Sequence, residues 1–287
     1  MTHLLLLVLL AGQPARAVSV TVTPPEPAQG QVVLVELSGG EPGDRISGTL
    51  GPRRLRFFVD ARHRVRALGG VRLDESGSLP LVVEVTPPGA EPVIHGLPIP
   101  IRPGEFEQQK LEVDPRFVRP PAKARARIRR ESRRIRKVWQ RKPTPRAWRG
   151  DFAWPRRDAI CSTFGLKRMF NGALASRHHG VDIDGKVGQP VAAIGTGTVV
   201  MVSRRYYSGG TVVVDHGLRL YSLYFHLSAF SVREGERVAR EQIIGAVGRS
   251  GRVTGPHLHL GVWLEGHYVD PLSLLALDLD EDPEKGS

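Results

Sequence analysis

Histidines gather in the C-terminal half of this 287-residue chain, in three settings whose spacing could do chemistry. Seven of the ten histidines lie in that half. His178 and Asp182 stand four residues apart in "RHHGVD", His226 lies in "YFHL", and His257 and His259 form an HxH pair in "PHLHL". Imidazole and carboxylate groups can hold a metal ion, and imidazoles can also transfer protons. These residue types therefore indicate a metal site, a proton-transfer site or both.

Strand geometry indicates which of these side chains can meet. Side chains alternate between the two faces of a strand with a period of two. His257 and His259 therefore share a face, and His178 shares one with Asp182 if the chain between them stays extended, whereas His179 faces away. Two imidazoles and one carboxylate on one concave face are the ligand set of a catalytic zinc ion, which keeps a fourth position open for water. The alternative is a surface HxH pair and a plain turn.

Two histidines remain outside such a three-ligand zinc site. His226 and one member of the 257/259 pair would lie beside the metal without binding it. A histidine in that place can accept a proton from water whose pKa zinc lowers to about 7, or stabilise a developing oxyanion. The spacing therefore predicts a zinc hydrolase site, not a structural zinc site.

Two β-rich regions frame these residues, so the predicted fold is mainly β. Residues 18–102 contain several short alternating strands separated by Gly and Pro clusters, which predicts an immunoglobulin-like β-sandwich. Residues 151–275 contain strands cut by Gly turns and no convincing helical period, which predicts a compact antiparallel β domain.

Residues 103–150 differ from both regions and read as a basic, partly helical linker. The formal net charge of the chain is +12, and residues 116–149 hold fifteen Lys or Arg but one acid, Glu131. A helix is predicted over 122–140, with an apolar stripe of Ile128, Ile135 and Val138. This helix is either a solvated helix docked on a domain or a tether to an anionic envelope polymer.

The N-terminus predicts export. A short apolar run followed by Ala15-Arg16-Ala17 fits a signal peptide over residues 1–17. The mature protein would lie in the periplasm or the extracellular envelope, without a transmembrane segment, and nucleic acid would be a poor partner. Cys161 is the only cysteine, which excludes an internal disulfide and a Cys-rich zinc module, and we expect it to be a buried thiol. Residues 276–287 form an acidic tail.

Residues 160–272 closely resemble the lysostaphin-like (LytM-type) zinc endopeptidases. The resemblance rests on "RHHGVDI", "LYSLYFHLS" and "VTGPHLHLGV", which occur in the family's order. It implies a β-rich fold with a zinc groove and cleavage of peptides in bacterial peptidoglycan. It also implies zinc ligands at His178, Asp182 and His259 and catalytic histidines at His226 and His257, without settling which is the base and which stabilises the oxyanion.

The same resemblance bears on three further features. His216 matches a family turn and is implied to be structural. Extra β domains in the family shield or position the groove. The resemblance therefore implies that residues 18–102 either inhibit the enzyme or position its groove. An asparagine fills the fourth zinc position in some latent members, and Asn171 is a candidate by residue type alone.

We therefore predict an exported zinc-dependent endopeptidase that hydrolyses peptide bonds in peptidoglycan, in cross-links or stem peptides, by zinc-activated water. The alternative is a non-catalytic LytM-like envelope scaffold or amidase activator. Degenerate family members have lost ligands, whereas all five positions here hold His or Asp. The scissile bond stays open among glycyl-glycine bridges, D-alanyl cross-links and stem peptides.

Overall fold

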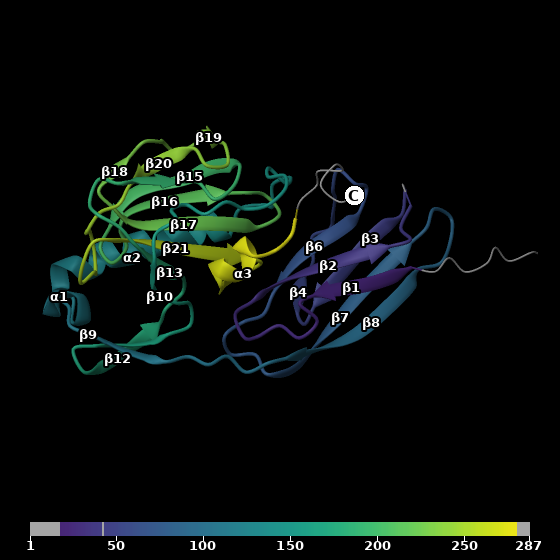
Figure 1. The fold of residues 1–287 in the computed structure, drawn as a ribbon, viewed down its shortest axis with the longest axis horizontal. Helices are drawn as coiled ribbons and strands as arrows, with labels where there is room; N and C mark the ends of the chain where they lie inside the picture. Colours follow the sequence, from purple (N-terminus) through teal and green to yellow (C-terminus); the bar gives the residue numbers. More distant parts are fainter. Residues whose placement is uncertain (1–17, 42, 280–287) are drawn as a thin grey trace, which may run out of the picture.

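The computed structural model describes residues 18–41 and 43–279, which form an N-terminal and a C-terminal β domain side by side (Figure 1). The predicted signal peptide and the last eight residues of the predicted acidic tail lie outside the described residues. The chain is mainly β, as predicted. Among the described residues, no helix has both the length and the apolar character needed to span a bilayer.

The N-terminal domain is a sandwich of two four-stranded antiparallel sheets. One sheet has the strand order β1-β2-β6-β5 and the other the order β4-β3-β7-β8. This order matches the ABED and CFG arrangement of immunoglobulin-like folds, with one added short strand. The apolar faces of both sheets form a shared core, which confirms the predicted sandwich. The strands are β1 (Ser19–Thr23), β2 (Val32–Ser38), β3 (Arg45–Leu50), β4 (Arg53–Arg54), β5 (Phe58–Val59), β6 (Val65–Gly70), β7 (Gly77–Thr86) and β8 (Val93–Ile101).

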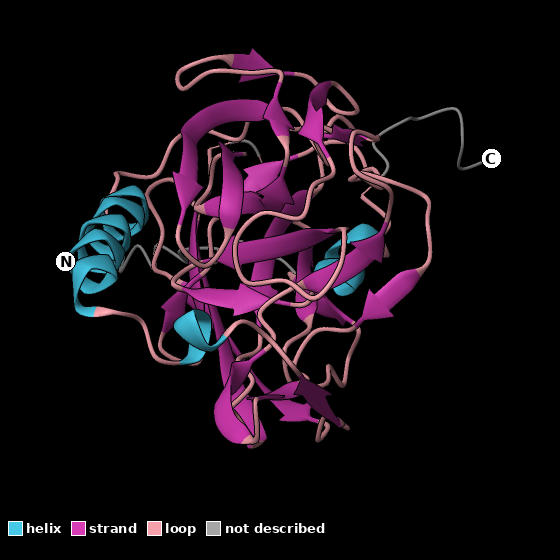
Figure 2. Cartoon of the chain, turned by 90° about the vertical axis from the view of Figure 1, so that its left-hand side faces the viewer, coloured by secondary structure: helices cyan, strands magenta, loops and turns pink. Residues whose placement is uncertain are grey.

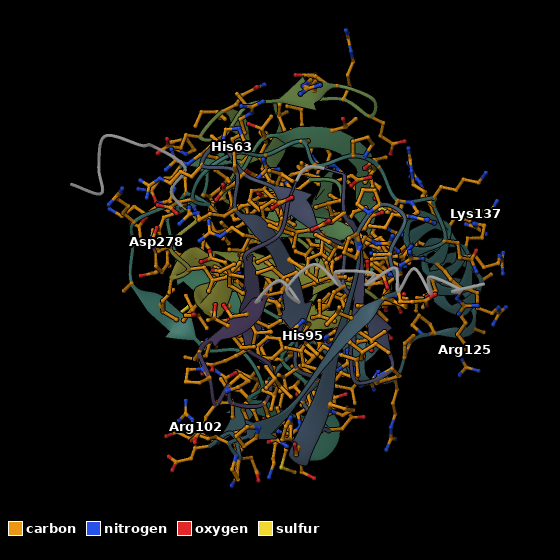
Figure 3. The ribbon with its side chains drawn as sticks, turned by 90° about the vertical axis from the view of Figure 1, so that its right-hand side faces the viewer. His63, His95, Arg102, Arg125, Lys137 and Asp278 are labelled. Atoms are coloured by element: carbon orange, nitrogen blue, oxygen red, sulfur yellow. The ribbon has the colours of Figure 1, made fainter. Side chains whose placement is uncertain are left out.

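One strand of the sequence pattern is split in the structure. The run at 54–59 reads as one strand, but it forms the end of β4 and all of β5, which belong to different sheets. The chain crosses between the sheets there, and the crossing buries both Leu55 and Phe58. His63 and His95 lie well apart on this domain, as expected of single histidines without a shared site (Figure 3).

Residues 103–150 pack on the C-terminal domain through β9 (Gln108–Leu111), α1 (Pro115–Val118) and α2 (Ala122–Trp139). The predicted helix ends one residue before its expected bound. Val138 is buried against the sheet, and Trp139 stacks on Trp263 with ring centroids 4.5 Å apart. The basic side chains point outward, and Arg125 and Lys137 project from the side of the molecule (Figure 3). Helix α2 is therefore both docked and strongly cationic.

The C-terminal domain is built on a large antiparallel sheet of order β10-β13-β21-β17-β16-β15-β19, with β22 paired to β21. Two three-stranded sheets flank it, β12-β11-β9 and β14-β20-β18. Its strands are β10 (Ile160–Ser162), β11 (Lys167–Phe170), β12 (Ala173–Arg177), β13 (Val181–Asp184), β14 (Pro190–Ala192), β15 (Gly197–Arg205), β16 (Gly209–Asp215), β17 (Leu220–Leu227), β18 (Ala229–Phe230), β19 (Arg237–Val238), β20 (Ile243–Ala246), β21 (His257–Leu264) and β22 (His267–Val269).

One short helix in this domain, α3 (Pro271–Leu275), was not expected from the sequence. The Asp270 side chain caps it by accepting a hydrogen bond from Leu272 N at 3.0 Å, and Pro271 occupies its first turn. A five-residue helix is too short to show a helical period of apolar residues. The Asp270-Pro271 pair at its start was therefore the one sequence feature that could have predicted it.

One face of the large sheet carries both helix α2 and the histidines. Tyr221 lies opposite Trp263 in the register of β17 and β21, and Phe225 lies opposite His259. Trp139 of α2 packs on the first pair, and the His259 ring stacks on Phe225 at 5.0 Å. Figure 2 shows α2 against one side of the sheets. The helix therefore covers one end of the face and leaves the other end to the site.

The two domains share a continuous apolar core. Val32 and Leu34 of the sandwich cluster with Val269 and Leu274 of the C-terminal domain. A Cβ at Gly70 would lie 2.7 Å from Val269 Cγ1, so the two surfaces approach as closely as glycine allows. Val32 N also donates to Ser273 Oγ at 2.9 Å. The sandwich is therefore packed firmly beside the second domain.

Candidate metal centre

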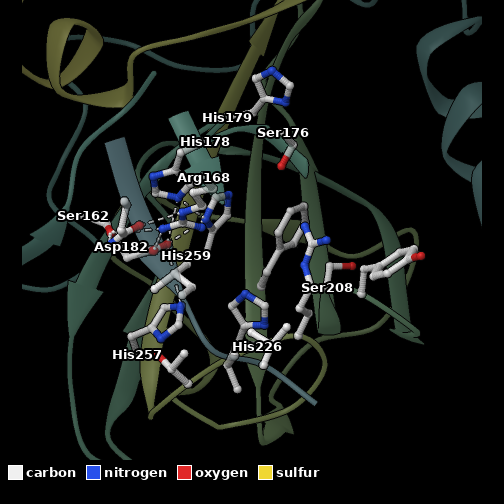
Figure 4. Close-up of a pocket in the computed structure, with 18 of the residues that line it drawn as sticks. Ser162, Arg168, Ser176, His178, His179, Asp182, Ser208, His226, His257 and His259 are labelled. Carbon is white, nitrogen blue, oxygen red and sulfur yellow. Dashed lines mark hydrogen bonds and ion pairs between the residues drawn. The ribbon is translucent and has the colours of Figure 1, made fainter. Parts of the chain in front are cut away.

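Three side chains from adjacent segments converge on one point (Figure 4). His178 Nε2 lies 3.0 Å from Asp182 Oδ1 and 3.0 Å from His259 Nδ1, and His259 Nδ1 lies 2.8 Å from Asp182 Oδ1. Asp182 and His259 meet because their residues are paired across β13 and β21. Within 18–41 and 43–279, these three form the one group with the geometry to hold a metal ion.

His178 reaches this point from the turn between β12 and β13. The expected extended chain over 178–182 is a strand only from Val181 onward. The backbone of His178 is fixed by two hydrogen bonds, His178 N to Leu166 O at 2.9 Å and Gly165 N to His178 O at 2.8 Å. Its Nδ1 donates to Thr163 O at 2.7 Å, which leaves the Nε2 lone pair for a metal.

The residues after His178 explain the rest of the HHGVD motif. The His179 ring points away from the cluster and stacks on Tyr268, with centroids 4.9 Å apart. At Gly180, a Cβ would lie 2.3 Å from Leu260 O and 2.6 Å from His259 Nε2. Glycine is therefore required there because β21 and the His259 ring pass directly beside the backbone.

The donor set fits zinc. Two imidazole nitrogens and one carboxylate oxygen suit zinc better than calcium or magnesium. All three residues are buried, yet they line a pocket of about 430 Å³ that substrate could enter. Burial lowers the pKa of His259 to about 4, against the pull of Asp182, so its ring is neutral at pH 7. Burial alone would raise the pKa of Asp182, but contact with His178 and His259 holds it well below its ordinary value.

His226 and His257 lie beside the cluster but outside the ligand group. Their rings are 4.9 Å apart, and His257 Nε2 lies 3.7 Å from Asp182 Oδ1. His226 Nδ1 donates to Ser250 O at 2.8 Å, and His257 Nδ1 donates to Gly255 O at 3.0 Å. In the neutral state each ring therefore presents an unprotonated Nε2, because its one proton is held on Nδ1.

The backbone at His226 is strained toward the pocket. Its φ of 64° lies in the left-handed region that non-glycine residues avoid. The register of β16 and β17 shifts between the Gly210 and Val212 pairs, which places a bulge at this histidine. Burial, with His257 and His259 nearby, holds the pKa of His226 well below its ordinary value. The bulge thus aims a neutral imidazole at the metal centre.

Sequence reasoning missed three residues that hold Asp182. Arg168 of β11 donates from Nη2 to Asp182 Oδ2 and to Ser162 Oγ, the latter at 3.0 Å. Arg168 Nε donates to Gln109 Oε1 at 2.9 Å, and Gln109 Nε2 donates to Ser162 Oγ at 2.8 Å. Gln109 belongs to β9, which pairs in parallel with β11. A strand of the basic segment therefore supports the carboxylate from behind.

We expect Arg168→Gln to weaken zinc binding by about 10- to 100-fold, as loss of a partner that orients a metal ligand commonly does. Without Arg168, Asp182 Oδ2 loses its cationic partner and the carboxylate can rotate. Competition with a chromogenic chelator measures the affinity. Lys167→Gln on the same strand, exposed and outside the pocket, is the matched control. Equal affinities for the two variants would contradict the role of Arg168.

Three other sequence expectations have structural outcomes. Cys161 is exposed in the pocket, so the expectation of a buried thiol was wrong. Its thiol pKa is raised by partial burial and by Asp182, which disfavours the thiolate form that a nucleophile needs. Asn171 binds both the N–H and C=O of Val113, at 2.8 and 2.9 Å. His216 is fully buried between Thr196 O and Ser222 Oγ, which is a structural environment.

Two imidazoles and a carboxylate in an open pocket form the donor set of a catalytic zinc site. Residues 176–271 match the sequence model of Peptidase family M23. The matched segment is about a third of the chain and contains all five His and Asp positions singled out in the sequence, in agreement with the resemblance found in its motifs.

Two curated relatives illustrate the likeness. Peptidoglycan DD-endopeptidase ShyA of Vibrio cholerae is 35% identical over 139 residues, which cover 48% of this chain and 30% of ShyA. DD-carboxypeptidase/endopeptidase Mpg of Neisseria meningitidis is 40% identical over 97 residues, which cover 34% of this chain and 22% of Mpg. This chain therefore spans less than a third of the length of these relatives.

A solved structure shares the fold over both domains. It is a Pseudomonas aeruginosa protein assigned to the M23 peptidases, with a TM-score of 0.67 and 24% sequence identity. The superposition covers 87% of this chain and 95% of that one. The likeness shows that the fold of this chain recurs almost whole in another protein.

Proposed function

We propose that this chain is an exported zinc endopeptidase that cleaves peptide bonds in bacterial peptidoglycan. The observation that carries the proposal is the convergence of His178, Asp182 and His259 beside two further imidazoles in one open pocket. A non-catalytic scaffold would not require these five residues, nor a pocket that leaves them accessible to substrate. ShyA is named a DD-endopeptidase and Mpg a DD-carboxypeptidase/endopeptidase, which favours the D,D cross-link among the open bonds.

The residues have separate roles in this mechanism. His178 Nε2, His259 Nδ1 and Asp182 Oδ1 would hold zinc, which would supply Lewis-acid chemistry by lowering the pKa of water to about 7 and polarising a carbonyl oxygen. His257 and His226 present unprotonated Nε2 atoms, so one can accept the proton from the attacking water. The protonated ring can then donate to the carbonyl oxygen or to the leaving amine.

Helix α2 and the N-terminal sandwich lie outside the pocket and have roles other than catalysis in this proposal. We infer that the cationic face of α2 holds the enzyme on an anionic polymer of the envelope. All residues that line the pocket lie between Gln109 and Tyr268 in the sequence, and no residue of the described sandwich is among them. The sandwich therefore supports the domain from beside the groove, and export follows from the predicted signal peptide.

We expect the purified chain to cut defined cross-linked muropeptides, with loss of activity on chelation and recovery with added zinc. Mass analysis of the products identifies the scissile bond. A mixture of D,D cross-linked dimers, glycyl-bridged dimers and uncross-linked stems offers all three bonds at once. Cleavage of the D,D cross-link is the expected result. A zinc-loaded chain that cuts none of the three would contradict the proposed function.

A further inference from the structure

A second cavity, separate from the metal centre, has arginine at five of its eleven lining residues. It has a volume of about 350 Å³ and lies where α1 and α2 meet the β15–β16 hairpin at 204–210 and the loop at 249–251. Its polar lining includes Ser250, whose carbonyl oxygen accepts the His226 Nδ1 proton in the neighbouring pocket. Its cationic lining is Arg116, Arg127, Arg204, Arg205 and Arg249. No acidic residue in the described part of the chain lines it.

Three of the five guanidinium groups are held by backbone carbonyl oxygens. Arg204 Nη2 donates to Ser228 O at 2.8 Å, and Arg249 Nη2 donates to Thr254 O at 3.2 Å. Arg205 Nη2 donates to Glu131 O, a backbone carbonyl, at 3.3 Å. Carbonyl partners fix the position of a cation but leave its charge uncompensated. All three arginines line the cavity. The Glu131 carboxylate lies near Arg205, whereas Arg204 and Arg249 have carbonyl partners.

The remaining two arginines have carboxylate partners at the rim. Arg127 Nε donates to Glu131 Oε1 at 2.6 Å, while Arg127 Nη2 donates to Arg204 O at 3.0 Å. Arg116 pairs with Asp114 at 3.2 Å, and both are exposed. Arg127 therefore links α2 to the strand that carries Arg204, and the cavity keeps a net positive charge.

We propose that this arginine cavity binds a phosphate group, as the monoester or diester of an anionic molecule of the envelope. A phosphate monoester offers three terminal oxygens, and a diester offers two together with its ester oxygens. These oxygens are arranged as a tetrahedron and can accept from guanidinium forks on separate elements, whereas the two oxygens of a planar carboxylate are matched by one fork. The cavity lies at the small end of the range for ligand sites, which suits a phosphate and the adjoining part of its carrier.

The site goes beyond the proposed peptidase activity, because it gives the basic segment a discrete ligand. The exposed arginines of α2 attract polyanions over a distance that salt screens. The cavity would fix one phosphate beside the loop that orients His226. A molecule whose phosphate binds in this cavity would lie next to the groove, whereas a polyanion attracted by the exposed arginines could bind anywhere along α2.

The test uses the full chain, inorganic phosphate and constant ionic strength. Phosphate binding is measured by calorimetry for the unaltered protein and for Arg204→Gln/Arg249→Gln. The control is Arg129→Gln/Arg133→Gln, which removes the same charge from exposed positions of α2 outside the cavity. We expect about a tenfold loss of affinity in the cavity variant and less than about a twofold loss in the control. Thermal unfolding confirms that both variants are folded.

Two further measurements sharpen the result. Acetate at the same ionic strength should not displace phosphate, and displacement by acetate would instead indicate a carboxylate site and overturn the proposal. Vesicles of phosphatidylglycerol that bind with the same variant pattern would place the phosphate on a lipid, and no vesicle binding would place it on a soluble carrier. No phosphate binding, or equal losses in both variants, would also overturn the proposal. Cleavage plays no part in these readouts, so they do not depend on the peptidase activity.

Discussion

His178→Ala is expected to remove zinc and abolish cleavage, whereas His179→Ala keeps zinc. The neighbours differ because His178 Nε2 lies 3.0 Å from both other ligand atoms, while the His179 ring stacks on Tyr268. Loss of one of three protein ligands should lower zinc affinity by more than the roughly 100-fold that loss of an outer partner costs. The chain should still fold, because Asp182 keeps its ion pair with Arg168.

Zinc content after dialysis and chelator competition measure this difference directly. His179→Ala is a matched control because it removes the same ring from the adjacent residue. Cleavage of a cross-linked muropeptide gives a second readout, and circular dichroism confirms folding. Equal loss of zinc from both variants would mean that His179 also turns into the cluster and that the geometry described here is wrong.

Much of the site could be anticipated because its signals are local. The HxH pair and the HxxxD spacing each depend on a few consecutive residues, and the register of β13 and β21 brings Asp182 opposite His259. The helix at 122–139 was equally visible, since its composition and its apolar stripe need no tertiary information. The HxH and helix predictions rest on side-chain periodicity, which the backbone dictates. His178 and Asp182 meet although the strand begins only at Val181, so the assumed extended chain was not the reason for their contact.

The supporting residues could not be found in this way because their contacts are distant in sequence. Gln109 and Arg168 are 59 residues apart, and they meet only because β9 joins the edge of β11. Arg168 looks like one more surface cation until Asp182 is placed opposite it. The φ of His226 is likewise set by a bulge, which the strand pattern of "LYSLYFHL" conceals.

The domain interface could not be predicted because the apolar residues of β2 are buried on both faces of the strand. Neighbouring residues on β2 point to opposite faces, so Val33 and Val35 fill the sandwich core while Val32 and Leu34 face the second domain. An apolar run buried on both faces has no alternation to reveal its second partner. The two domains could therefore be predicted from the sequence, but the surface through which they pack together could not.

His257→Ala and His226→Ala are each expected to keep zinc and to lose cleavage by about 10²- to 10⁴-fold, the range for a general acid or base. Neither belongs to the ligand group, and both present a free Nε2 to the pocket. Zinc affinity close to that of the unaltered chain separates them from His178→Ala. If His257→Ala lost zinc instead, then His257 Nε2, 3.7 Å from Asp182 Oδ1, would be a ligand.

The double variant decides whether the two histidines serve one step. Their rings are 4.9 Å apart, so a proton taken by one is delivered within reach of the other. Residues that act as a unit show strongly non-additive losses. The double variant should therefore lose little more than the worse single variant, in kcat and with KM nearly unchanged. Losses that multiply would instead mean that the two rings act on separate steps, one on the water and one on the carbonyl oxygen.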